Sequence, residues 1–267
     1  MGSLSDFAEN ELLDHVCNGS YDPPATIYLA LSTADPADDA SGLSEPSGNG
    51  YARKAIAFGA AASRKVEQDG QVAFDEATGA WGTITHWAVM DADSAGNMLA
   101  HGAFSPSKEV VANNTPSVAT TEVYVEFSAG EISDYLANKL LDFLFRDQAF
   151  AQPDTYVALT TATVADDDDG DTITEVSGGS YARKQVNQNG GASPTWDAAA
   201  AGIVDNTHAV TFAEATASWG TVTSAAILDA ASSGNLLFYD NDEVADQAVS
   251  TSDVVEFGAG ELDVQLT

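Results

Sequence analysis

The stretch "EATGAWGTIT" (Glu76–Thr85) occurs a second time, slightly changed, as "EATASWGTVT" (Glu214–Thr223). Seven of the ten positions are identical, and Trp81 and Trp219 are among them. After each tryptophan, threonines alternate with other residues, and such alternation is typical of a β-strand. The two stretches therefore predict that a strand-rich unit has been duplicated within the chain.

The duplication extends along most of the sequence. The other matching pairs are "LSDF" and "ISDY" (4–7 and 132–135), "ELLD" and "KLLD" (11–14 and 139–142), "IYLALSTA" and "TYVALTTA" (27–34 and 155–162), "YARK" (51–54 and 181–184), "DADSAGNML" and "DAASSGNLL" (91–99 and 229–237), and "EFSAGEI" and "EFGAGEL" (126–132 and 256–262). We expect two tandem domains, residues 1–131 and 132–267, each folding around its own core. The spacing also predicts that the second copy gains about eight residues before the tryptophan motif and loses eight after the "GN" turn.

The end of the second copy suggests a difference between the two. In "GELDVQLT" the apolar residues Leu262, Val264 and Leu266 alternate, as they do in a strand. The stretch aligned with it in the first copy, "GEISDYLA", already begins the next helix. We therefore expect the first copy to lack its closing strand or to borrow it, which would leave a sheet edge in need of cover.

Each copy begins with a helical pattern and continues with strands. Apolar residues recur every four positions after a serine that can cap the helix, Ser5 in the first copy and Ser133 in the second. The rest consists of short runs rich in Val, Thr, Tyr and Phe, separated by Gly, Ser, Asn and Asp. This predicts a mainly β fold with one short N-terminal helix per repeat, arranged as two tandem β-sandwich or flattened-barrel domains.

The composition is strongly acidic, with 41 Asp and Glu against 9 Lys and Arg and a formal net charge of −32. The acids are spread between periodic apolar segments, which argues against a disordered acidic chain. At about 1 M salt the Debye length is roughly 3 Å, so the repulsion within such a surface is screened. The charge therefore indicates a folded protein of a high-salt habitat. A nucleic-acid partner is not expected, because phosphate contacts need clustered Lys and Arg.

Other compositional features exclude further classes. The chain has no run approaching the roughly 20 apolar residues of a membrane helix, so no membrane partner is expected. The single cysteine, Cys17, excludes an internal disulfide and a zinc site made of several cysteines.

Signatures of catalysis and of metal binding are missing from the sequence. It contains no P-loop, no G-x-G-x-x-G and no G-x-S-x-G motif, and none of its four histidines has a histidine counterpart in the other copy. The acidic run "DDDDG" (Asp166–Gly170) does not match a calcium loop, because the sixth residue counted from Asp167 is Thr172 and not glycine. We expect a protein that is not an enzyme and that has no cofactor and no metal site.

The "YARK" motif holds four of the nine basic residues, and each tyrosine follows a glutamate by six positions. The residues concerned are Arg53, Lys54 and Glu45 in the first copy and Arg183, Lys184 and Glu175 in the second. One interpretation is an ion pair within each domain that clasps the preceding loop. The other is a docking point, where the guanidinium would bind a carboxylate of another subunit.

The tryptophan motif also has two interpretations. Trp81 and Trp219 are candidate core aromatics of the repeat, packed where the adjacent glycine permits a close approach of the backbone. An exposed tryptophan would instead offer a platform for a sugar ring, as in a host-recognition protein.

Taken together, the motifs resemble a family of small virion proteins of tailed viruses, whose members are often labelled tail fibre or head-decoration proteins. The resemblance lies in "LSDYLANKLLD" and "EVSGGSYARK", followed in order by "EATASWGTVT", "ILDAASSGNLLFY" and "VEFGAGEL". It covers nearly all of both copies and is strongest from Ile132 to Thr267. With the acidity, it implies a virus of halophilic archaea, with assembly in a high-salt cytoplasm and a final location in the virion.

The resemblance implies a structural module without catalytic residues. The main hypothesis is a capsid decoration, cement or turret protein that binds the assembled major capsid lattice, as a trimer or pentamer. The first alternative is a tail or tail-fibre component that contacts the host surface. The second alternative is a free-standing glycan-binding module. The expected partners are the major capsid protein or other virion proteins.

Overall fold

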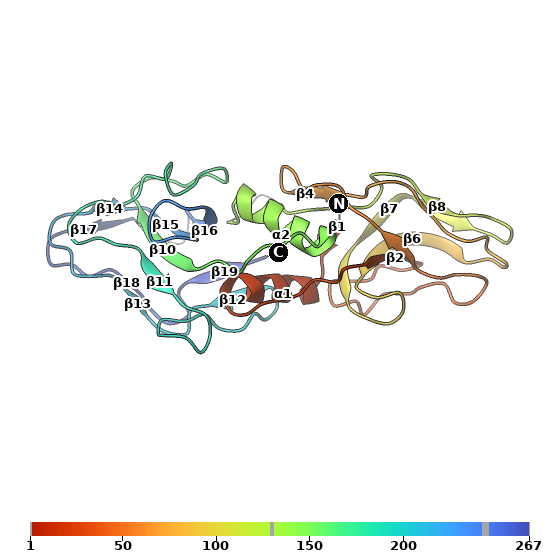
Figure 1. Ribbon diagram of the computed structural model, residues 1–267, viewed down its shortest axis with the longest axis horizontal. Coiled ribbons are helices and arrows are strands. Elements are labelled where there is room, and N and C mark those ends of the chain that lie inside the picture. The colour runs from red at the N-terminus through yellow and green to blue at the C-terminus, as the bar shows by residue number, and fades with distance from the viewer. Residues whose placement is uncertain (1, 129–130, 242–245, 267) are drawn as a thin grey trace.

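The computed structural model describes residues 2–128, 131–241 and 246–266. The molecule is elongated, with a β-rich part at each end and two helices between them (Figure 1). The described ends of the chain both lie near the middle of the long axis. We call residues up to 128 the first unit and residues from 131 the second unit.

The first unit contains one helix and a curled sheet. Its elements are β1 (Gly2–Leu4), α1 (Asp6–Cys17), β2 (Ile27–Ser32), β3 (Lys54–Ile56), β4 (Lys65–Glu67), β5 (Val72–Ala73), β6 (Gly82–Met90), β7 (Met98–Val110), β8 (Ser117–Val118) and β9 (Tyr124–Glu126). Within residues 2–128 the main sheet has the order β3-β2-β6-β7-β1-β9-β4, and β5 pairs with β8.

The second unit repeats this order of elements. They are α2 (Asp134–Arg146), β10 (Thr155–Thr160), β11 (Lys184–Val186), β12 (Ile203–Asp205), β13 (Val210–Thr211), β14 (Gly220–Val222), β15 (Ser224–Leu228), β16 (Leu236–Asp240), β17 (Gln247–Val249), β18 (Glu256–Phe257) and β19 (Asp263–Gln265). The described strands form the sheet β11-β10-β15-β16 and the pairs β12–β19, β13–β18 and β14–β17. The predicted fold class, mainly β with one helix in each of two tandem units, is confirmed.

The expectation that the first unit lacks its closing strand is wrong. In β4 and β9 Val66 lies opposite Val125, and in β12 and β19 Val204 lies opposite Val264. Strand β9 is therefore the counterpart of β19, and it closes the first unit. The similarity of "EFSAGEI" to "EFGAGEL" is misleading. Glu256 lies in β18 and pairs with Thr211 of β13, in the same way as β8 pairs with β5, so β18 is the counterpart of β8 and not of β9. The predicted loss of eight residues after the "GN" turn is therefore also wrong, because the second unit keeps its inserted residues up to its last strand.

The two predicted serine caps are present, and each also fastens its helix to the sheet. The Oγ of Ser5 accepts a hydrogen bond from the amide of Ala8 at 3.2 Å, and the Oγ of Ser133 accepts one from Leu136 at 3.1 Å. The Ser5 hydroxyl also donates to the carbonyl of Met98, at the start of β7. Each helix therefore begins where its own unit's sheet holds it, and the rest of the helix points toward the other unit.

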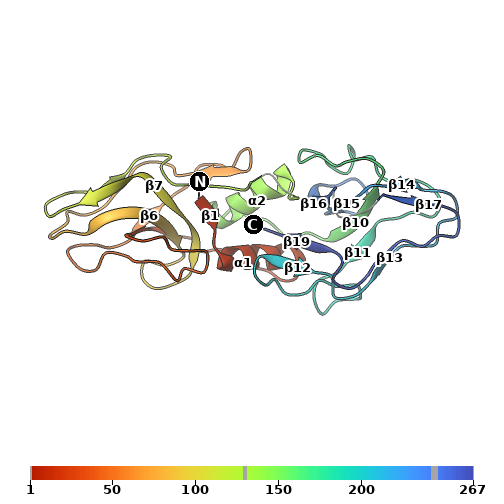
Figure 2. The ribbon, with the colours of Figure 1, turned by 180° about the vertical axis from the view of Figure 1, so that it is seen from behind.

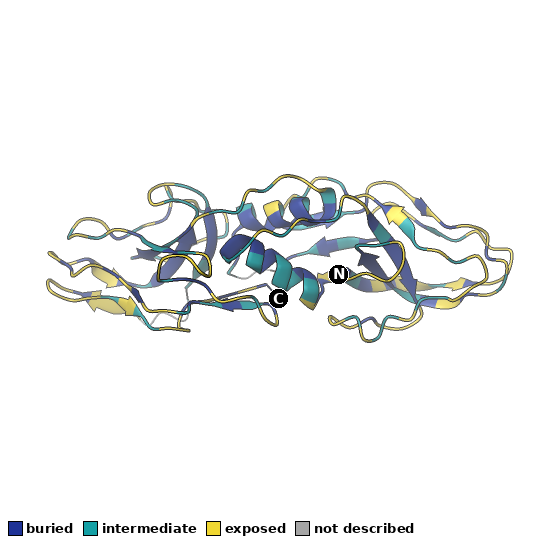
Figure 3. Ribbon diagram, turned by 60° about the horizontal axis from the view of Figure 1, so that its bottom comes forward, coloured by how far each residue is buried: buried dark blue, intermediate teal, exposed yellow. Residues whose placement is uncertain are grey.

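The core is continuous, in contrast to the expectation of a separate core for each copy. One cluster of buried apolar side chains contains residues of both sheets and of both helices. Helix α1 contacts β7 of its own unit and β12 of the other, while α2 contacts β16 of its own unit and β4 of the other (Figure 2). Buried residues follow the helices and the inner strands, and exposure is greatest in the loops at both ends (Figure 3). The domain boundary at 131/132 stays a prediction.

In the described parts of the chain no helix combines the length and the apolar character that crossing a bilayer requires.

Candidate functional site

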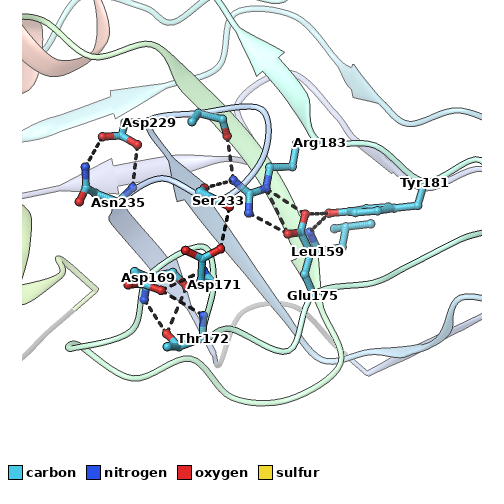
Figure 4. A network of polar contacts seen from close by, with 11 residues as sticks. Leu159, Asp169, Asp171, Thr172, Glu175, Tyr181, Arg183, Asp229, Ser233 and Asn235 are labelled. Carbon is cyan, nitrogen blue, oxygen red and sulfur yellow. Dashed lines mark hydrogen bonds and ion pairs between the residues drawn. The ribbon is translucent and has the colours of Figure 1, made fainter.

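The YARK motif of the second unit forms a compact network around one carboxylate (Figure 4). Glu175 accepts hydrogen bonds from the Tyr181 hydroxyl at 2.8 Å, from Nε of Arg183 at 3.0 Å and from its Nη2 at 2.8 Å. Nη1 of Arg183 donates to the carbonyls of Ala230 and Ser233, both at 2.7 Å. We call Glu175, Tyr181 and Arg183 the loop clasp, because they join three segments. These are the acidic loop that follows β10, the residues just before β11 and the turn after β15.

The turn held by the clasp is itself built from short-range polar contacts. Asp229 accepts from the amide of Asn235 at 2.7 Å and from its side-chain nitrogen at 2.6 Å. Gly234 between them has φ 84°, and a Cβ there would lie 2.5 Å from Oδ1 of Asp229. The Ser233 hydroxyl donates to Asp171 of the acidic loop at 2.6 Å. The "GN" motif therefore shapes a turn whose carbonyls face the arginine.

The first unit contains the same clasp, made of Glu45, Tyr51 and Arg53. The Tyr51 hydroxyl donates to Glu45 at 2.6 Å, and Nη2 of Arg53 donates to the same carboxylate at 2.6 Å. Nη1 of Arg53 donates to the carbonyls of Ala92 at 2.8 Å and Ala95 at 2.7 Å. Because the network occurs in both units with nearly the same distances, it belongs to the repeat.

Burial decides what the clasp can do. The arginine side chains are 7% exposed in the first unit and 2% exposed in the second, and their Nε, Nη1 and Nη2 atoms are all engaged. Burial raises the pKa of the Tyr51 and Tyr181 hydroxyls, and the neighbouring glutamates raise it further, so both remain hydrogen-bond donors. The two arginines therefore hold loops in place and are not available to dock a partner.

The lysines of the motif lie outside the clasp. Lys54 pairs with Asp75 at 2.7 Å, and its side chain is 28% exposed. Within the described residues Lys184 makes no ion pair with a carboxylate. Docking of a partner through this motif would therefore depend on the lysines, and it stays a proposal.

Both repeat tryptophans are buried beside the clasps. Trp81 is 6% exposed and donates from Nε1 to the carbonyl of Asn49 at 2.9 Å, while Trp219 is 5% exposed and donates to that of Gly179 at 3.0 Å. The ring of Tyr51 meets Trp81 edge-on at 5.2 Å, and Tyr181 meets Trp219 at 5.3 Å. Neither tryptophan presents a face on which a sugar ring could stack.

The four histidines serve structural contacts or lie near carboxylates. His15 is buried; its Nδ1 accepts from the amide of Tyr21 at 3.1 Å, and its Nε2 donates to the carbonyl of Phe150 at 2.9 Å. Burial lowers the pKa of His15, so the ring stays neutral. His101 donates to Asp38 at 2.8 Å, a contact that the sequence did not indicate. Within residues 2–128, 131–241 and 246–266 no three His, Cys, Asp or Glu side chains form a group that could hold a metal ion.

The acidic run of the second unit is used for backbone and ion-pair contacts. Asp168 accepts from the amide of Ala165 at 2.7 Å, and Asp169 accepts from that of Asp171 at 2.9 Å. Asp166 pairs with Arg64 of the first unit at 2.7 Å. These carboxylates order their own loop and connect it to the other unit.

The residues that join the two units were not indicated by the sequence. They lie on the helices, at Asn10 and Asp14 in α1 and at Asn138 and Asp142 in α2. One signal was present, since both pairs recur at the separation of 128 residues within the repeated helix. Polar residues on a helix are usually solvated, however, so this repetition alone did not point to a contact.

Comparison with known proteins identifies the repeat. A family model described as "Podophage GP4 fiber I protein gp80" matches residues 3–126 and, a second time, residues 131–265. The two matches coincide with the two units and together cover nearly the whole chain. No curated protein matches the sequence.

Proposed function

Because the chain belongs to the podophage fibre I protein family, we propose that it is a fibre component of a viral tail that contacts the host surface. A non-enzymatic structural role in a virion follows from the family. The position on the tail is our proposal, and the observation that carries it is the description of the family as a fibre protein. This reverses the order of the sequence-based hypotheses, since the tail-fibre alternative fits better than the capsid decoration.

The shape of the molecule supports this proposal. The two β-rich parts lie at opposite ends of an elongated body, and their exposed loops project away from the central helices (Figures 1 and 3). The loop clasps hold the loop before β3, the loop before β11 and the turns after β6 and β15 in place through buried ion pairs, which stiffens each unit. A long body with exposed loops at both ends suits a part that reaches from the particle to a receptor.

The glycan-binding alternative loses its main support, because Trp81 and Trp219 are buried. Association with other virion proteins and with further copies of the chain is part of our proposal. The acidic surface, with its net charge of −32, supports a virus of a high-salt host, and this too stays a proposal.

Location and copy number in the purified virion test the proposed function. Immunogold labelling against this chain is expected to mark the tail, and quantitative mass spectrometry is expected to give about ten copies or fewer per particle, since a few tens would indicate a head turret. Labelling spread over the head, with hundreds of copies, would support the decoration hypothesis and overturn ours. Antibody fragments against the end loops are also expected to block adsorption to host cells.

A further inference from the structure

The contact between the units is made by each helix reaching across to the other unit. Oδ1 of Asn10 in α1 accepts a hydrogen bond from the amide of Gly202 at 2.9 Å, and Oδ1 of Asp14 accepts one from Ala199 at 2.8 Å. Gly202 and Ala199 belong to the turn that leads into β12 of the second unit. Side chains of α1 thus satisfy backbone donors of a turn more than 180 residues away in the sequence.

The reverse contact uses the equivalent residues. Oδ1 of Asn138 in α2 accepts from the amide of Arg64 at 3.0 Å, and Oδ1 of Asp142 accepts from that of Ala61 at 2.8 Å. Arg64 and Ala61 lie in the turn before β4, the counterpart of β12. The same patch on each unit therefore contacts its complement on the other, which is the arrangement found at the interface of a two-fold symmetric dimer.

The interface has an apolar centre with close ring contacts. The leucines on the central faces of the helices are fully buried, namely Leu12, Leu13, Leu136, Leu140, Leu141 and Leu144. His15 of the first unit lies 4.3 Å from the ring of Phe143 of the second, and Phe58 lies 4.9 Å from Phe145. Such a centre resembles a domain core divided in two, as in obligate homodimers.

We propose that this contact is a protein–protein interface between two fibre units, and that the partner each unit binds is another unit of the same family. In this chain the partner is supplied by fusion, and the peptide link between Ser128 and Glu131 is dispensable for pairing. The family match supports this, because it falls into two segments of the chain, residues 3–126 and 131–265, one in each unit. The inference rests on the contacts between the units and not on the position of the protein in the virion.

Within the described residues, the ion pairs that Arg64 makes across the interface have no equivalent in the other half. Nη1 of Arg64, whose side chain is 9% exposed, lies 2.7 Å from Oδ2 of Asp166 and 3.7 Å from Oδ1 of Asp134. Gly202 is the counterpart of Arg64, so Asp38, the counterpart of Asp166, faces no arginine and binds His101 of its own unit. The two aspartates form a matched pair, in which only Asp166 contributes a bond between units.

The test uses the full-length protein with a protease recognition sequence in place of the two residues between Ser128 and Glu131. The variant is folded in concentrated salt, cleaved, and analysed by size-exclusion chromatography and analytical ultracentrifugation beside its uncleaved form. We expect the two fragments to stay together at the size of the intact chain with unchanged circular dichroism. Fragments that separate or aggregate overturn the proposal, and so does an uncleaved insertion variant that fails to fold, because the link is then required.

The aspartate pair tests whether pairing uses the observed contacts. In the cleaved protein, Asp166→Ala is expected to raise the dissociation constant of the fragments about tenfold, since a partly exposed ion pair is lost. Asp38→Ala is expected to change it by less than about twofold. Equal effects of the two substitutions would contradict the assignment of the Arg64 contact to the interface.

Discussion

Glu9 lies where the two units meet, and its carboxyl group should make the stability of the protein depend on pH. It faces Gly202 of the second unit, where a Cβ would lie 2.8 Å from its Oε2. Burial, together with the negative charges of Asp38 and Asp6, raises the pKa of Glu9 from 4.5 to about 8. Glu9 is therefore protonated in the folded protein near neutral pH.

The sign of the effect follows from linkage. Between pH 4.5 and 8 the folded protein keeps a proton that the unfolded chain has released, so the free energy of unfolding falls as the pH rises. The stabilisation is fully present below pH 4.5 and is lost as the pH passes 8. The whole pKa difference corresponds to about 5 kcal/mol, and we expect about 2 kcal/mol because Glu9 is only partly buried and solvent screens it.

The substitution Glu9→Gln tests this prediction, because glutamine resembles the protonated acid at every pH. Denaturant unfolding at constant high salt is expected to give equal stabilities for the two proteins near pH 4.5. At pH 9 the variant is expected to be more stable by about 2 kcal/mol. Asp69→Asn removes one charge at an exposed position and serves as the control, with the same pH profile as the unsubstituted protein. Parallel profiles for Glu9→Gln and the unsubstituted protein would show that Glu9 does not cause the pH dependence.

Three further predictions concern the clasp, the tryptophans and the surface charge. Arg183→Met should lower the free energy of unfolding by about 3 kcal/mol, because it leaves the Glu175 carboxylate without its partner; Arg146→Met, in a more exposed pair, should cost less than about 1 kcal/mol in the same denaturation assay. Trp219→Phe should cost about 1 kcal/mol through the lost hydrogen bond to Gly179, whereas Trp219→Ala should cost about 4 kcal/mol because it also opens a cavity. Transfer from about 1 M to about 0.1 M salt should lower the melting temperature sharply in scanning calorimetry, and an unchanged temperature would mean that the acidic surface is not adapted to salt.

The features that the sequence predicted correctly depend on local chemistry that is present twice. Ser5 and Ser133 precede helices whose first amides need an acceptor, so the caps could be located from the pattern. Arg53 and Arg183 form ion pairs with glutamates eight residues earlier, which was one of the two interpretations, and docking of a partner through the motif stays a prediction. In each case the side chain and the group that it binds lie within a short segment of the sequence.

The features that the sequence did not reveal depend on which segments meet in space. The similarity of "EFSAGE" and "EFGAGE", which share five of six positions, conceals the correspondence of β9 with β19 that the strand pairings show. The contact between the two units could not be predicted either, because it also depends on segments that are distant in the sequence. Asn10 and Asp14 look like solvated helix residues until the turn containing Gly202 is placed against them.

Fusion of the two units also bears on how an acidic fibre protein can pair at all. A chain of net charge −32 brings two acidic bodies together, and in dilute salt their mutual repulsion opposes association. Two devices reduce that cost. Salt at about 1 M shortens the Debye length to roughly 3 Å, so the repulsion acts only between groups almost in contact. The covalent link raises the effective concentration of one unit near the other to the millimolar range. The apolar centre and the reciprocal side-chain contacts then need to overcome only the residual short-range repulsion. This explains why, among the described residues, the ion pairs of one arginine, Arg64 with Asp166 and Asp134, suffice at so acidic an interface.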